Sequence, residues 1–180
     1  MHFRDLDAHW GLAVALGSMG IAAFNLAQPD RAEACLRESA SLDRVIGDRW
    51  GLMYASTYLG LTLIVKGNYE EAERLIIDAI EHMLVLGRRV IIPESFEGLV
   101  AVAAAKGENE RAVLFAGAAE AIRDVVGSMA SPTLQSIRDG YLTRARSQLE
   151  AATFESLYDR GKAMPLDRII ELALSGGAPV

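Results

Sequence analysis

The chain has 180 residues, of which 51% are hydrophobic and 23% charged, and its formal net charge at pH 7 is −6. Such a composition excludes a disordered chain, because it offers enough apolar surface for a core. The acidic balance lacks the basic stripe that neutralises phosphates, so we expect no direct nucleic-acid binding. A single cysteine, Cys35, excludes an intrachain disulfide.

Identical residues recur along this chain at a spacing of 40. The sets that show it are Gly47, Gly87 and Gly127; Ala32, Ala72 and Ala112; and Trp10 and Trp50. A fixed period in this range is typical of stacked supersecondary units rather than of one closed globule. The pattern therefore predicts a repeat architecture.

Each 40-residue unit has the pattern of two helices joined by a tight turn. In the second unit, Leu52, Ala55, Leu59 and Leu63 have helical spacing, and Gly67 suits the left-handed position that ends a helix. The helices predicted in this way are 7–27, 30–46, 50–66, 69–86, 93–106 and 110–126. Gly87 is expected to end the fourth of them.

The period stops after Gly127. We predict three further helices, over 134–149, 153–160 and 166–174, which would cap the last apolar face of the array. Residues 1–127 would thus form three helical hairpins and residues 128–180 the capping helices of the same domain. Residues 1–6 align with 41–46, so we expect the chain to begin inside an earlier repeat, as a fragment of a larger regulator would.

The repeat resembles the tetratricopeptide repeat. The second unit carries Leu59-Gly60, Leu63, Gly67-Asn68-Tyr69 and Ala72, in which small residues are needed where two helices cross closely. The third unit has Val100 where glycine is expected. The resemblance implies an all-α, right-handed α-solenoid of three 40-residue hairpins with C-terminal capping helices.

Longer stretches are similar to the C-terminal repeats of bacterial STAND-type ATPases and LuxR-type or AfsR-like transcriptional regulators. They are GDRWGLMYASTYLGLTLIVKGNYEEAERL, FEGLVAVAAAKGENERAVLFAGAAEAIRDVVG and the closing FESLYDRGKAMPLDRIIELAL. This resemblance implies a regulatory or sensor module. The family's ATPase signature is missing from this segment, because Ser156 stands where the first glycine of a P-loop ending in Gly161-Lys162 would be.

Catalytic and metal-binding patterns are not apparent. His82 lies four residues after Asp78, which permits a weak metal site, but a surface ion pair is the better interpretation. Glu70, Glu71 and Glu73 lie at a helix start, where carboxylates stabilise the helix. We therefore expect no enzyme, cofactor or metal. No stretch reaches 18 uncharged apolar residues, and the first ten residues, MHFRDLDAHW, contain no apolar segment of the kind that a signal peptide has. We therefore expect a cytoplasmic protein without membrane contact.

The inner face of the array is the candidate binding surface, because the first helix of each hairpin lines the concave side in tetratricopeptide arrays. It would hold a protein, a peptide or a small effector. The alternative is that these side chains only form core or pack against the C-terminal helices. Val14, Ser18 and Ile21 belong to this face, together with the principal candidates Phe24, Asn25, Tyr54, Thr57, Tyr58, Leu61, Glu94 and Glu97.

A second hypothesis is structural. The uncapped N-terminal edge would drive self-association as a homodimer or a scaffold without effector binding, with Phe3, Leu6 and Trp10 buried between subunits. The oligomeric state of the isolated chain discriminates between the two hypotheses.

Overall fold

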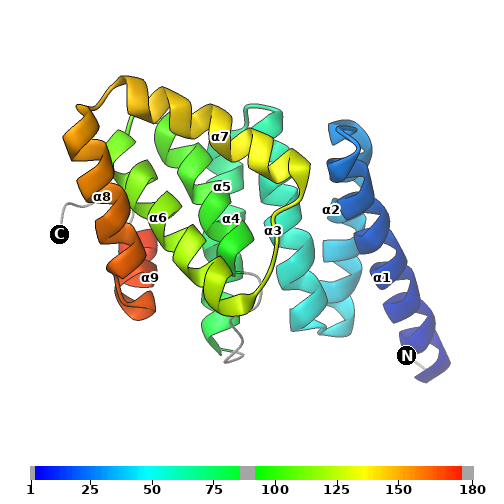
Figure 1. Cartoon of the computed structure of the whole chain (residues 1–180). Coiled ribbons are helices and arrows are strands. Elements are labelled where there is room, and N and C mark those ends of the chain that lie inside the picture. Colours follow the sequence, from blue (N-terminus) through cyan, green and yellow to red (C-terminus); the bar gives the residue numbers. More distant parts are fainter. Residues whose placement is uncertain (1–2, 86–91, 176–180) are drawn as a thin grey trace. The chain divides into compact units, whose positions relative to one another are not determined.

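The computed structural model describes residues 3–85 and 92–175, and every element in these ranges is an α-helix. In chain order the helices are α1 (Phe3–Asn25), α2 (Pro29–Ile46), α3 (Arg49–Val65), α4 (Tyr69–Val85), α5 (Ile92–Ala105), α6 (Asn109–Val126), α7 (Pro132–Ser147), α8 (Ala151–Ala163) and α9 (Leu166–Leu174) (Figure 1). The predicted all-α class is confirmed. No helix in the described ranges has both the length and the hydropathy that membrane crossing requires.

The observed helix boundaries lie close to the predicted ones. The second helices α2, α4 and α6 begin at Pro29, Tyr69 and Asn109, which are 40 residues apart. The largest differences are that α1 already begins at Phe3 and that α8 extends to Ala163. The expected stop at Gly87 lies outside the described residues. The stacking of all three hairpins in a right-handed solenoid stays a prediction.

The turns inside the three hairpins share one backbone conformation. Gly67 and Gly107, which follow α3 and α5, have φ angles of 79° and 80°. Ala27, at the corresponding position after α1, has a φ of 54°. The left-handed region suits glycine and strains a residue with a Cβ atom. The first hairpin therefore keeps the turn at some cost.

The chain divides into two compact units, residues 1–88 and 89–180. In the first unit, α1 packs on α2 and α3 packs on α4, while α3 also contacts α1 and α2. Glycine permits the close helix crossings in both hairpins. A Cβ on Gly20 would lie 2.5 Å from Leu36 Cγ, and one on Gly60 would lie 2.7 Å from Ile76 Cγ1. The predicted need for small residues at these crossings is confirmed.

The second unit is built around α6, which contacts α5, α7, α8 and α9. Glycines again allow close approach, this time between α6 and α8. A Cβ on Gly117 would overlap the carbonyl oxygen of Tyr158, and one on Gly161 would overlap that of Leu114. Because α7 also packs on α5, helices from beyond residue 127 cover both members of the third hairpin.

Candidate binding site

A cavity of about 290 Å³ lies between the facing sides of α1 and α3 in the first unit. The α2 helix closes it from behind with Ser39 and Asp43. Its volume is close to the lower end of the range for small-molecule pockets, about 300–1,000 Å³. A single side chain or small effector therefore suits it better than a large cofactor. The residues that line it include Val14, Ser18, Ile21, Trp50, Tyr54 and Asp43.

Some of the predicted inner-face residues line this cavity and others do not. Tyr54 contributes to the wall, and its ring centroid lies 5.1 Å from that of Trp50. Phe24 is buried and packs edge-on against Tyr58, with ring centroids 5.9 Å apart. Thr57 and Leu61 are fully buried and Asn25 is exposed. A role of these residues in partner binding stays a prediction.

Asp43 is the unusual group of this cavity, because its carboxyl group is buried without adequate partners. The residue is 1% exposed, and its Oδ1 atom has no hydrogen-bond partner among the residues that the structure describes. The Ser39 hydroxyl lies 3.3 Å from Oδ2, but the same hydroxyl lies 2.9 Å from the carbonyl oxygen of Ala13. One hydroxyl proton serves only one of the two acceptors at a time. A buried polar group in this state is costly and calls for an explanation.

The chain makes room for this carboxyl group by omitting side chains around it. A Cβ on Gly51 would lie 2.5 Å from Asp43 Oδ1, and a Cβ on Gly17 would lie 3.1 Å from Ser39 Oγ. The nearby Asp48 is already occupied as the N-cap of α3. Its carboxylate accepts hydrogen bonds from the backbone N–H groups of Trp50 and Gly51 and from the indole of Trp10.

Burial raises the pKa of Asp43 to about 6, and the neighbouring carboxylate of Asp48 adds to this effect. No cationic side chain of the described part of the chain is among the groups that shift this pKa. At neutral pH most molecules therefore carry an unpaired carboxylate at the back of a cavity whose walls are apolar and aromatic.

Asp43 is not among the site residues predicted from the sequence, although the 40-residue period carries a signal for it. The residue 40 positions later is Met83, which is buried on α4, and the residue 80 positions later is Arg123 on α6. Because the equivalent position of the second hairpin holds a buried methionine, the 40-residue period predicts that the carboxyl group of Asp43 is buried as well.

In the second unit, the corresponding charged position is compensated. Arg123 donates to Glu97 of α5, and its NH1 group lies 3.9 Å from Glu94. Arg138 of α7 also reaches Glu97, at 3.5 Å. The Glu97 side chain is completely buried, and burial raises the pKa values of both glutamates. A partner would reach Glu97 only after displacement of α7.

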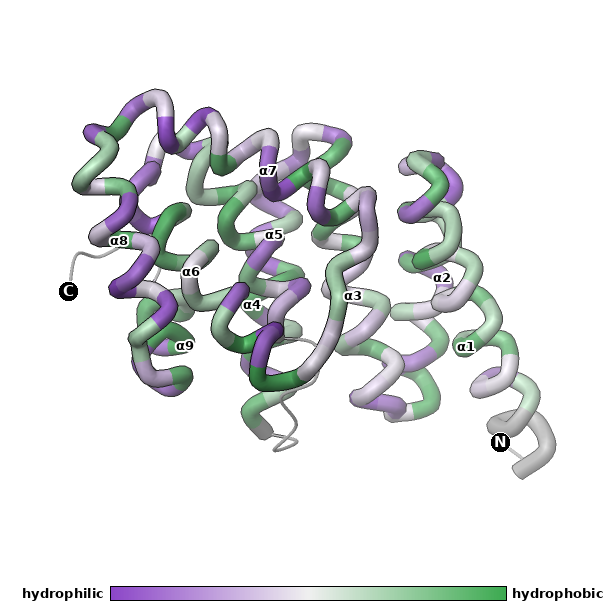
Figure 2. Tube along the Cα trace, viewed as in Figure 1, coloured by the Kyte–Doolittle hydropathy of each residue, from purple (hydrophilic) through white to green (hydrophobic). Residues whose placement is uncertain are grey.

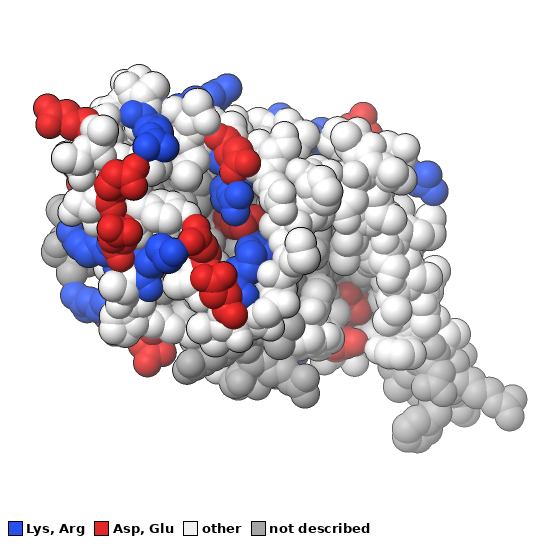
Figure 3. Space-filling view, in the orientation of Figure 1, with Lys and Arg blue, Asp and Glu red and all other residues white. Residues whose placement is uncertain are grey.

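The same unit carries a second charge network at its surface. Glu120 of α6 accepts a hydrogen bond from the Tyr158 hydroxyl and pairs with Lys162 at 2.5 Å. These hydrogen bonds, that of Lys162 first, lower the pKa of Glu120. In Figure 3, basic and acidic side chains alternate over the face formed by α6, α7 and α8. These opposite charges neutralise each other, so this face has no electrostatic preference for an anionic or a cationic ligand.

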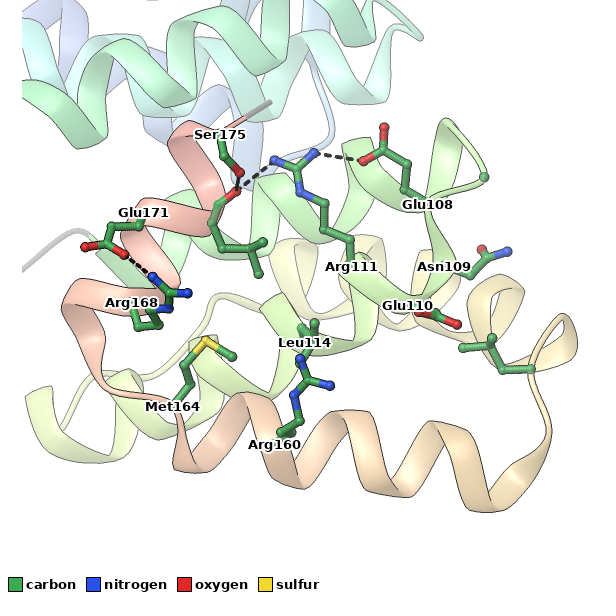
Figure 4. Close-up of a pocket in the computed structure, with 13 residues that line it drawn as sticks. Glu108, Asn109, Glu110, Arg111, Leu114, Arg160, Met164, Arg168, Glu171 and Ser175 are labelled. Carbon is green, nitrogen blue, oxygen red and sulfur yellow. Dashed lines mark hydrogen bonds and ion pairs between the residues drawn. The ribbon is translucent and has the colours of Figure 1, made fainter. Parts of the chain in front are cut away.

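A larger cavity, of about 940 Å³, lies between the start of α6, the end of α8 and α9. Arg111 extends from α6 towards α9, where it donates to the carbonyl oxygens of Leu172 and Ala173, both at 3.2 Å (Figure 4). It also pairs with Glu108 at 2.8 Å. The last carbonyl groups of a helix lack partners within it, so Arg111 caps α9.

The charges around this larger cavity are balanced. Arg168 pairs with Glu171 at 2.6 Å, so two of the three lining arginines have carboxylate partners (Figure 4). Its lining contains three arginines and three glutamates and gives no net preference for an anion or a cation. The smaller Asp43 cavity is therefore the better candidate, because it holds an uncompensated charge.

The predicted self-association edge is described only at Trp10, because the side chains of Phe3 and Leu6 lie outside the described residues. Trp10 is 55% exposed, and its indole N–H donates to Asp48 Oδ2 at 3.2 Å. The α1 helix also carries an exposed apolar stripe with helical spacing, and hydrophobic or neutral residues cover most of its length (Figure 2). The stripe consists of Leu12, Ala15, Met19, Ala22 and Leu26.

Among the residues that the structure describes, no group of three or more His, Cys, Asp or Glu side chains is placed to hold a metal ion. His82 turns back to its own helix, where its Nδ1 atom lies 2.6 Å from the backbone carbonyl oxygen of Asp78. Comparison of the chain with models of protein families, with curated proteins and with solved structures found no match.

Proposed function

We propose that the chain is a non-enzymatic protein-interaction and regulatory module whose first unit holds a partner segment in the cavity between α1 and α3. The observation that carries the proposal is the unpaired Asp43 carboxyl group behind an open cavity with apolar and aromatic walls. The 40-residue repeat and the resemblance to the arrays of STAND and LuxR-type regulators support a sensor role within such a protein.

The proposed role is binding rather than catalysis because, among the described residues, the lining of this cavity contains a single carboxyl group. Acid–base catalysis by carboxyl groups needs two of them with separated pKa values facing one substrate. The nearby Asp48 is engaged as a helix cap and is unsuited to that role.

The position of the cavity suggests how binding would be transmitted. The α1 helix belongs to the first hairpin and α3 to the second, so a bound side chain would contact both hairpins at once. A ligand shifts a conformational equilibrium only by its differential affinity for the two states. A partner that bridges α1 and α3 would favour the packing of the two hairpins that fits it best.

The proposal is tested by selecting peptides from a random library on the immobilised chain. The selected peptides are then assayed against Ser18→Trp, which places a bulky ring in the lining of the cavity. The matched control is Ser41→Trp, at an exposed position of α2 outside the lining. We expect Ser18→Trp to weaken peptide binding at least about tenfold, since a filled pocket loses its buried contacts. Failure to select any peptide that depends on Ser18 would refute the proposal.

The α1 stripe favours a second candidate function, self-association. Helices normally bury such a stripe, and large exposed apolar patches mark interaction sites. Sedimentation at rising concentration tests this alternative with Met19→Lys in the middle of the stripe. A dimer that Met19→Lys dissociates would support a scaffold role, whereas a monomer at all concentrations would remove it.

A further inference from the structure

We infer that the cavity between α1 and α3 is specific for an alkyl chain that ends in a cation, with the ammonium group of a partner's lysine against Asp43. This inference rests on the proposed function and names the chemistry that the same cavity recognises. It follows from the charge at the back of the cavity, from the residues that line it and from the different hydrogen bonding of the two carboxylate oxygens.

The electrostatic surroundings of Asp43 favour a cation from outside. The residues that face Asp43 from α1 and α3 include Ala13 and Gly51, and neither carries a charge. Among the described residues, the charged group that shifts the pKa of Asp43 is another carboxylate, that of Asp48, and it adds negative potential. A cation supplied from outside would therefore provide the partner that the fold leaves out, and charge-assisted hydrogen bonds are the strongest kind available.

The apolar lining of the cavity suits the methylene stem of a lysine side chain. Val14 and Ile21 line the α1 side, and Ala55 contributes on the α3 side. An apolar passage that ends in a carboxylate matches the lysine side chain, which combines a methylene stem with a charged end. The rings of Trp50 and Tyr54 add π faces near the same passage, and these attract cations.

The hydrogen bonding of the two Asp43 oxygens favours an ammonium group over a guanidinium group. A guanidinium group recognises a carboxylate best when both oxygens are free for two parallel hydrogen bonds. In Asp43 the Oδ2 atom lies beside the Ser39 hydroxyl, and Oδ1 alone has no partner. A compact ammonium group can use one oxygen, so the geometry favours lysine over arginine.

The pH dependence of binding follows from the protonation state of Asp43. A cation binds the ionised carboxylate, and the pKa of this group is raised to about 6. Binding is therefore expected to be full above pH 7 and to weaken as the pH falls through 6. Asp48, whose carboxylate also acts on the pKa of Asp43, accepts three hydrogen bonds as the cap of α3.

The experiment uses pentylammonium chloride as the probe and pentan-1-ol as its neutral analogue. Binding is followed by the amide resonances of Gly17 and Gly51, which belong to the cavity lining. We expect saturable shifts with pentylammonium and a response to pentanol that is on the order of tenfold to hundredfold weaker. Equal binding of the two probes would overturn the inference, and so would stronger binding of pentylguanidinium than of pentylammonium.

A matched pair of variants assigns the charge preference to one residue. Asp43→Asn is expected to remove the preference for pentylammonium, whereas Asp30→Asn, at an exposed position of the same helix, should leave it unchanged. Retention of the preference in Asp43→Asn would overturn the inference. If Asp43→Asn fails to fold, the pH profile of the unmodified chain decides. Weakening below pH 6 supports Asp43, and constant binding from pH 5 to 8 excludes it.

Replacing lysine by norleucine in the selected peptides separates this inference from the proposed function. Peptide binding that depends on Ser18 but survives the replacement overturns the lysine specificity and leaves the interaction module standing. Binding of pentylammonium with no Ser18-dependent peptide overturns the interaction module and leaves a site for a free amine. Loss of peptide binding on replacement supports both.

Discussion

Asp43 of α2 and Gly51 of α3 approach so closely that a methyl group on Gly51 would lie 2.5 Å from Oδ1 and 2.8 Å from Oδ2. No relaxed Cβ contact is this short, so the carboxyl group keeps its place only because residue 51 has no side chain. Gly51 follows Asp48, which caps α3 through the backbone N–H of Gly51 itself. The start of α3 therefore supplies both the cap and the space for the buried carboxyl group.

Gly51→Ala is expected to displace Asp43 and to close the cation site. Overpacking of a filled region costs about 1–3 kcal/mol, so the first unit should lose stability by that amount. The matched control is Gly11→Ala on α1, where a Cβ would meet nothing within 4 Å. That change should stabilise α1 by about 0.5–1 kcal/mol, because alanine favours the helix interior. Urea unfolding measures both effects.

Asp43→Asn is expected to change the pH dependence of stability. The folded pKa of about 6 lies above the free value of 3.8, so the folded state binds the proton more tightly. The contribution of this group to the free energy of unfolding is greatest below pH 4 and is lost as the pH rises through 6. A difference of about two pKa units corresponds to about 3 kcal/mol. The free-energy difference between variant and parent should therefore shift in favour of the variant by about 3 kcal/mol between pH 4 and pH 8. A difference that is the same at both pH values would contradict the burial of this charge.

The helices were predictable from the sequence because their signals are local. Gly67 marked the turn after α3, and the apolar spacing from Leu52 onward marked the helix itself. The boundaries of α9 agree with the prediction at both ends. Each of these features depends on residues within one or two turns of each other. The 40-residue period repeats the same local signals in each unit.

The environment of individual side chains was less predictable because it depends on the helices that pack there. Val100 stands where glycine was expected, and the structure supplies the reason. The partners of Gly20 and Gly60 are the large residues Leu36 and Ile76, whereas the corresponding residue of α6 is Ala116. In the third hairpin the large residue, Val100, lies on the first helix and the small one, Ala116, on the second. A pattern that considers one helix at a time does not predict this exchange.

The prediction for Glu97 shows the same limit for charges. Its spacing placed it on the inner face of α5, and the structure brings Arg123 and Arg138 to it from α6 and α7. The sequence separations from Glu97 are 26 and 41 residues. No local pattern joins residues so far apart, so the pairing became visible only in the folded chain.

Arg123→Met is expected to destabilise the second unit by about 3–5 kcal/mol, because it leaves the buried Glu97 carboxylate with Arg138 alone at 3.5 Å. Adding Glu97→Leu should recover much of this loss, since an apolar pair can replace a buried ion pair. The control is Arg168→Met, whose exposed pair with Glu171 should contribute no more than about 1 kcal/mol. A double-mutant cycle by urea unfolding measures the coupling, and a coupling near zero would contradict this account.

Gly117→Ala is expected to separate α8 from α6. The added methyl group would overlap the backbone of Tyr158, and backbone cannot move aside without shifting the whole helix. We expect a loss of at least about 1–3 kcal/mol. Gly140→Ala on α7 is the control, because a Cβ there would meet nothing within 4 Å, and it should raise stability by about 0.5–1 kcal/mol. Equal effects of the two changes on thermal unfolding would argue against the close crossing.

Ala27→Gly is expected to stabilise the first hairpin, although glycine usually weakens a chain. Ala27 has a φ of 54°, and Gly67 has a φ of 79° at the corresponding turn. A left-handed conformation costs a residue with a Cβ about 1–2 kcal/mol. The greater unfolded-state entropy of glycine offsets about 0.4–1 kcal/mol of the relief. The net gain should be up to about 1.5 kcal/mol, and Gly67→Ala should lose a similar amount in the second hairpin. Urea unfolding of the two variants tests whether their stability changes have opposite signs. A loss of stability in Ala27→Gly would show that the first turn is not strained.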